Sequence, residues 1–263
     1  MNKNNLPNLL EKLNFSKEGL LYKKSFEDSL IYVDLNRNEI VYPEDKGLIV
    51  NEKQICNLSK NENFVVLECV CRLLELGYKP NHIELEPSWK VGRGKSGGRG
   101  DILIKNNNSP FLLIECKTYG KEFDSEKKAL HNDGGQLFGY AQNEDVDYLC
   151  LYASTLKEDI ERTYVLISIK DPILKKAKSK NRNHLFQTWT EQFSSYYENF
   201  GIFEDNCLPF HLEKRSRKYH DLNKISENDK QNKIQSFAAI LRKHNISGRE
   251  NAFDKLVNLF LAK

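Results

Sequence analysis

Apolar residues recur along the chain with two different spacings, and each spacing predicts a kind of element. Between residues 65 and 74 they fall every three or four positions, which is the period of a helix with a buried face, and Gly77 ends the pattern. Ser59 followed by Glu62 has the spacing of a capping box at the start of this helix. The same period predicts a short N-terminal helix from Leu6, Leu9, Leu10 and Leu13.

From residue 82 onward, short apolar runs alternate with turns and with one helical stretch over residues 135–142. Strands interleaved with helices at this spacing predict an α/β (α+β) fold, with a mixed central β-sheet flanked by helices. A glycine-rich loop is expected at residues 90–100. The expected strands are HIELEPSW (82–89), DILIK (101–105), FLLIECK (111–117), DYLCLYAS (147–154) and TYVLISI (163–169).

Changes of composition divide the chain into four regions. Residues 1–48 join the first helix to hairpin-like segments and are interpreted as an N-terminal flap, and residues 49–175 form the predicted core. Residues 176–233 are basic and polar, as linkers and loops are. Residues 234–263 return to a helical pattern whose apolar face has no later partner segment, which suggests a fragment of a longer protein.

Composition narrows the class of protein without naming a partner. The 40 basic and 37 acidic residues give a net charge of only +3, so nucleic-acid binding has to be argued from local features. Apolar runs are too short for a membrane span and the start lacks a secretion signal, so we expect a cytoplasmic protein without membrane partners. The six cysteines are scattered with no CxxC pair, which is typical of reduced thiols.

Three charged residues stand out within the predicted strands. Glu115 and Lys117 are two apart and project from one face of a strand, and Asp101 stands at the start of the preceding strand. If the strands pair, the two acids offer oxygen ligands for Mg²⁺ or Mn²⁺, with Lys117 beside the attacking water. The competing interpretation is an aspartate that closes a glycine turn and a surface ion pair on an edge strand.

This arrangement resembles the PD-(D/E)XK nuclease superfamily, with Asp101 as the first acid and the ECK sequence as its E-x-K element. Gln136 and Tyr140, four apart on the following helix, resemble the Q-x-x-x-Y element of nuclease domains in type I restriction-enzyme motor subunits and type IIG enzymes. The resemblance covers about residues 60–170. It implies a restriction-endonuclease-like fold and metal-dependent hydrolysis of double-stranded DNA. Alternatively, Tyr140 is a core residue of an amphipathic helix.

The resemblance also implies an acid from the helix that precedes the sheet and a backbone ligand from Cys116. Helical geometry favours Glu62, which shares the apolar stripe, over Glu68, which falls beside Arg72 on the opposite side. The capping role expected for Glu62 competes with a role as a metal ligand, so both acids stay candidates.

The glycine-rich loop contains GKS, but it is not a nucleotide-binding P-loop, because Trp89 stands where the first glycine of that motif belongs. Arg93, Lys95 and Arg99 are instead candidates for contacts with DNA phosphates next to the metal site. A solvated loop without such contacts is the alternative.

Residues 238–263 resemble the first helices of the helical domain of restriction–modification adenine methyltransferases, although no methyltransferase or helicase motif is present. The expected partners are therefore double-stranded DNA and the methyltransferase and specificity domains or subunits of a larger enzyme. Two alternatives to a nuclease stay open. One is a non-cleaving nuclease-like module that binds DNA or docks a methyltransferase, and the other is a structural domain whose Asp101 and Glu115 do not converge.

Overall fold

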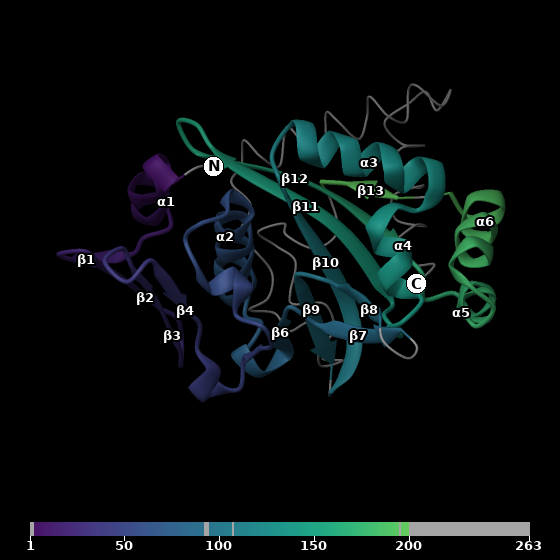
Figure 1. Cartoon of the computed structure of the whole chain (residues 1–263), viewed down its shortest axis with the longest axis horizontal. Helices are drawn as coiled ribbons and strands as arrows, with labels where there is room; N and C mark the ends of the chain where they lie inside the picture. Colours follow the sequence, from purple (N-terminus) through teal and green to yellow (C-terminus); the bar gives the residue numbers. More distant parts are fainter. Residues whose placement is uncertain (1–2, 92–94, 107, 195, 200–263) are drawn as a thin grey trace, which may run out of the picture. The chain divides into compact units, whose positions relative to one another are not determined.

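The computed structural model describes residues 3–91, 95–106, 108–194 and 196–199 (Figure 1). The helical segment expected at 234–263 and most of the connecting region therefore lie outside the described residues. No helix in the described part of the chain has the length and apolar character needed to cross a membrane.

A mixed sheet of seven strands forms the centre of the described chain. Its strands are β5 (Ile49–Val50), β6 (Ile83–Leu85), β9 (Ile102–Asn106), β10 (Ser109–Thr118), β11 (Tyr148–Leu156), β12 (Ile160–Ser168) and β13 (Tyr197–Glu198). Their order is β13-β12-β11-β10-β9-β6-β5. The pairs β10–β11 and β5–β6 are parallel and the others are antiparallel, which confirms the predicted mixed α/β fold.

Helices cover both faces of this sheet, as its alternating side chains require (Figure 1). The helices of the described chain are α1 (Leu6–Lys12), α2 (Asn61–Glu75), α3 (Lys121–Asp133), α4 (Gly135–Ala141), α5 (Pro172–Lys178) and α6 (Arg182–Gln192), with short 3₁₀ helices at Lys3–Asn5, Glu44–Lys46, Gln54–Cys56 and Pro80–His82. Ile114 and Cys116 of β10 join the core under α2, whereas Leu113 joins the core under α3 to α6. One strand thus supplies both cores.

The N-terminal region forms a small sheet of its own. Its strands, in spatial order, are β1 (Ser16–Glu18), β2 (Leu21–Ser25), β3 (Leu30–Asp34) and β4 (Glu39–Val41). A turn that includes residues 36–38 joins β3 to β4. Buried residues of α1 and this sheet, such as Leu9 and Val33, belong to the same apolar cluster as Val66 of α2. The segment interpreted as a flap therefore packs against the long helix.

Two local expectations are wrong. The capping box does not form, because α2 begins at Asn61 and its N-cap is Lys60, which makes no capping hydrogen bond. The backbone N–H of Ser59 instead donates to the Asn57 side chain. The expected glycine-rich loop is partly an antiparallel hairpin of β7 (Ser88–Val91) and β8 (Lys95–Arg99). Glycines are tolerated in a ribbon whose neighbours approach closely.

Two helical regions also differ from expectation. The helix α3 was not expected, since its polar sequence buries only Phe123 and Leu130. The start of the region interpreted as linkers and loops belongs to α5 and α6, where Leu185 and Trp189 are buried against α4. Basic composition describes the solvated face of these helices and does not exclude a buried one.

Candidate active site at the end of β10

The pairing of β9 with β10 brings Asp101 to the strand that carries Glu115 and Lys117. Ile102 at the start of β9 pairs with Ile114 in antiparallel register. Asp101, one residue before Ile102, therefore lies beside the residues of β10 that follow Ile114. There its Oδ2 accepts a hydrogen bond of 2.7 Å from the backbone N–H of Cys116. The two acids therefore converge, against the alternative in which they point apart.

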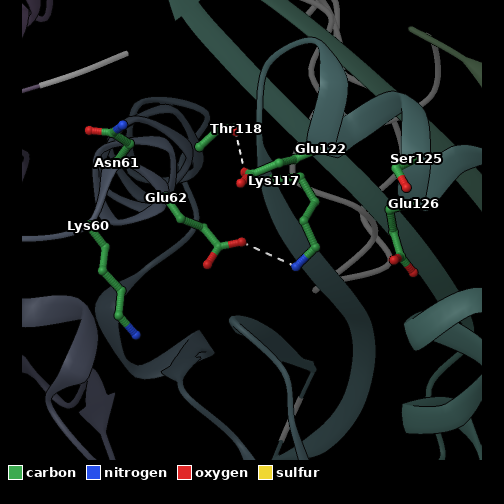
Figure 2. Close-up of a pocket in the computed structure, with 8 residues that line it drawn as sticks. All are labelled: Lys60, Asn61, Glu62, Lys117, Thr118, Glu122, Ser125 and Glu126. Atoms are coloured by element: carbon green, nitrogen blue, oxygen red, sulfur yellow. Dashed lines mark hydrogen bonds and ion pairs between the residues drawn. The ribbon is translucent and has the colours of Figure 1, made fainter.

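Lys117 pairs with two of the carboxylates, and Figure 2 shows its contact with Glu62. Its Nζ is 2.5 Å from Glu115 Oε1 and 3.2 Å from Glu62 Oε1. Burial alone lowers the pKa of Lys117, but Glu115 and Glu62 reverse this effect and raise the pKa above its ordinary value. The side chain is therefore an ammonium group at neutral pH.

The carboxylates outnumber this single ammonium group. Glu115 is only 3% exposed, and within the described chain its buried Oε2 has no hydrogen-bond partner. Burial raises the pKa of Glu115 well above its usual range, and the charge of Asp101 raises it further. Burial, followed by the charge of Glu62, raises the pKa of Asp101 to about 7, against the Cys116 N–H and Lys117. This excess of negative charge fits a divalent cation held by hard oxygen ligands.

Of the two candidate acids on α2, Glu62 is the one at this site. Its carboxylate points toward the Lys117 ammonium from the first turn of the helix (Figure 2). Glu68 is fully buried elsewhere, where its two oxygens accept hydrogen bonds of 2.7 Å from Tyr152 Oη and from Arg162 Nε. The expectation that Glu68 lies on the face opposite the sheet is wrong, because both of its partners are on sheet strands.

The helix α4 places the Gln136 and Tyr140 pair near the same carboxylates. Gln136 Nε2 donates to Tyr140 Oη at 3.3 Å, so the two side chains share one helical face as predicted. Tyr140 is half-buried. Burial raises the pKa of Tyr140, and the next largest causes are the charges of Glu115 and Asp101. Tyr140 therefore contributes both to the core and to the surroundings of the site.

The candidate DNA contacts have different positions. The guanidinium group of Arg99 binds Glu52 Oε2 at 2.9 Å and Gln54 Oε1 at 3.1 Å, so it anchors the end of β8 within the protein. Arg93 lies outside the described residues, and Lys95 is described only through its backbone in β8. Cys116, the candidate backbone ligand, turns its buried side chain into the core under α2.

A cavity of about 590 Å³ opens next to Lys117. It lies between the start of α2, the end of β10 and α3 (Figure 2). Sequence reasoning missed the contribution of α3, although Phe123 and Leu130 are seven positions apart, which is a helical spacing. The cavity is lined by Lys60, Asn61, Glu62, Lys117, Thr118, Glu122, Ser125 and Glu126.

No set of three or more histidine, cysteine, aspartate or glutamate side chains is arranged to hold a metal ion within the residues described. Lys117 pairs with both Glu115 and Glu62, so these carboxylates are held by the ammonium group. A cation bound by Asp101 and Glu115 would therefore need further oxygen ligands from water or phosphate. Comparison with models of known protein families gives no match, and comparison with curated proteins gives none either.

Proposed function

We propose that this chain is a Mg²⁺- or Mn²⁺-dependent deoxyribonuclease of the PD-(D/E)XK type that hydrolyses phosphodiester bonds of double-stranded DNA. The observation that carries the proposal is the convergence of Asp101, Glu115 and Lys117, with one buried Glu115 oxygen that has no partner among the described residues. A buried carboxylate oxygen without a hydrogen-bond partner is costly, so such an atom supports a site that takes up a ligand.

Asp101 and Glu115 would hold the cation, and Glu62 and the Cys116 carbonyl are further candidates. The cation would neutralise their charge and polarise the phosphate. Hydrolysis adds the water oxygen to phosphorus and breaks one P–O bond of the backbone; the proton that the water loses to solvent balances the proton that the leaving oxygen takes up. Because Lys117 stays protonated beside Glu115, it acts as a donor that orients the water and stabilises charge on the attacked phosphate.

The Gln136 and Tyr140 pair supports the site from the side of α4. The Tyr140 hydroxyl stays protonated because its pKa is raised, so it can donate a hydrogen bond to a phosphate oxygen. We place this activity in a larger restriction–modification enzyme, with methyltransferase and specificity domains or subunits that recognise the target sequence. The resemblance of residues 238–263 to a methyltransferase helical domain supports this setting.

The experiment is cleavage of supercoiled plasmid DNA by the purified chain in Mg²⁺ or Mn²⁺, with EDTA as the metal-free control. Lys117→Ala and Asp101→Ala should abolish nicking. Lys105→Ala is the matched control, because Lys105 pairs with Glu84 on the same sheet away from the site, and it should cleave normally.

The absence of cleavage by the wild-type chain would point to the non-cleaving module. Calorimetric titration of Mn²⁺ would then test the site itself. Binding by the wild type and not by Asp101→Ala would keep the metal site, whereas binding by neither would exclude it.

A further inference from the structure

The connection between α3 and α4 has a backbone and a close packing that favour glycine. Gly134 and Gly135 have φ angles of +88° and +53°, where other residues are strained. A Cβ atom at Gly135 would lie 2.5 Å from Glu126 Oε1, and one at Gly134 would lie 2.8 Å from the Phe138 Cβ. The close approach at Gly135 brings the Glu126 carboxylate directly against the start of α4.

Hydrogen bonds fix this connection from three sides. The Gln136 N–H donates to Glu126 Oε1 at 2.7 Å, and the Gly135 N–H donates to Asp133 Oδ1 at 2.9 Å. Arg182 Nη2 donates to the carbonyl oxygens of Gly135 at 2.8 Å and Asp133 at 3.1 Å. Of these anchors, Glu126 is the one that also lines the cavity beside Lys117.

The fixed helix in turn places the Tyr140 ring. Gln136, whose backbone Glu126 holds, donates from its side chain to Tyr140 Oη at 3.3 Å. On another side the ring meets β8 so closely that a Cβ atom at Gly98 would lie 2.9 Å from Tyr140 Cε1. A shift of α4 would therefore move Tyr140 against β8 or away from it.

We infer that Glu126 is a positioning residue that sets Gln136 and Tyr140 against the candidate active site through its hydrogen bond to the first turn of α4. The effect of this placement of Gln136 and Tyr140 on catalysis rests on the proposed nuclease function, whereas the placement itself does not. Glu122 lies one turn earlier on α3 and lines the same cavity, yet it bonds to Thr118 instead of α4. It provides a matched control on the same helix.

The experiment uses the full chain with 3-fluorotyrosine at position 140 and records its ¹⁹F resonance without metal or DNA. Glu126→Gln keeps an oxygen acceptor for the Gln136 N–H and should leave the resonance at the wild-type position. Glu126→Asp keeps the charge but is one methylene shorter, and it should move the resonance toward the value of the urea-unfolded chain. Glu122→Ala should leave the resonance unchanged.

An unchanged resonance in Glu126→Asp, or equal shifts in Glu122→Ala and Glu126→Asp, would overturn the inference. Neither change at Glu126 is expected to prevent folding, because both keep a polar side chain at a half-buried position. Plasmid cleavage is measured in parallel. The positioning role predicts a loss of cleavage in Glu126→Asp and its recovery in Glu126→Gln, whereas a wild type that does not cleave would refute the nuclease without altering the spectral result.

Discussion

The helix α2 contributes one glutamate to each of two charged clusters. The clusters differ in whether every carboxylate oxygen has a partner. Around Glu68, each carboxylate oxygen has its own partner at 2.7 Å, the Tyr152 hydroxyl for one and the Arg162 guanidinium for the other. This cluster is buried and satisfied. Networks of this kind fix neighbouring elements and leave no capacity for a ligand.

Around Glu62 the balance is different. Glu62 and Glu115 share one ammonium group, that of Lys117, while Asp101 accepts a hydrogen bond from the Cys116 N–H, and Glu115 Oε2 has no partner in the described chain. Here burial raises the pKa of Asp101 and that of Glu115; the charge of Glu62 raises the pKa of Asp101 further, and the charge of Asp101 does the same for Glu115. A cation would relieve this repulsion. The comparison teaches that burial of an acid does not by itself mark a site, whereas a deficit of partners does.

The largest expected effect is on nuclease activity, which a change at Glu115 should lower and a change at Glu68 should not. Glu115→Gln removes a ligand charge and should lower the rate of metal-dependent plasmid nicking by about 10²–10³-fold, as the loss of an electrostatic contact in an active site does. Glu68→Gln keeps the shape of the other cluster and should nick DNA at a rate near that of the wild type. Equal losses in the two variants would remove the distinction.

The second effect is on stability. Here the variant at Glu68 should lose more than the variant at Glu115. Glu68→Ala leaves Arg162 and Tyr152 without their acceptor, so we expect the free energy of unfolding to fall by about 3 kcal/mol. Glu115→Gln removes a repelled charge and should lose little stability. Urea unfolding followed by circular dichroism measures both, and a larger loss in Glu115→Gln would contradict the assignment of the structural cluster.

Strand periodicity and strand pairing were sufficient to predict that three charged side chains come together, and the limits of such patterns have physical causes. Alternation along residues 111–117 places Glu115 and Lys117 together, and pairing of consecutive strands adds Asp101. Helical periodicity placed Glu62 on the side of the helix where it contacts Lys117 but assigned Glu68 to the wrong face, because it assumes that a helix has one buried side. The helix α2 is buried almost all round, between the central sheet and the N-terminal region.

Other features depend on contacts that no local pattern encodes. The interaction of Glu126 with Gln136 joins two helices across two glycines with positive φ angles. Arg99 is basic and lies in a glycine-rich stretch, yet tertiary packing gives it Glu52 and Gln54 as partners. Charge alone therefore could not predict these internal partners, and the DNA contact expected for Arg99 stays a prediction.

A third effect is the dependence of stability on pH. Because the pKa of Asp101 is about 7 in the folded chain against 3.8 for the ordinary side chain, the folded state binds more protons between these values. The contribution of Asp101 to the free energy of unfolding should thus become less favourable as pH rises from 5 to 8, by an amount on the order of 2 kcal/mol.

The pH effect is measured as the difference in unfolding free energy between the wild type and Asp101→Asn, which should grow in favour of the variant as pH rises. Asp145→Asn is the control with the opposite sign. Hydrogen bonding to Lys175 lowers the pKa of Asp145, so its contribution changes only below about pH 4. A flat difference for Asp101→Asn from pH 5 to 8 would show that its carboxyl titrates normally.

The smallest effect is stabilisation of the folded chain by the cation itself. At ten times its dissociation constant, Mg²⁺ or Mn²⁺ should stabilise the wild type by about 1.4 kcal/mol, which raises Tm by about 2–4 °C for each kcal/mol. Glu115→Gln should lose this shift. Glu84→Gln should retain it, because Glu84 pairs with Lys105 on the neighbouring strands instead of the site. A shift retained by Glu115→Gln would place the bound cation elsewhere and leave the unpaired Glu115 oxygen without its proposed purpose.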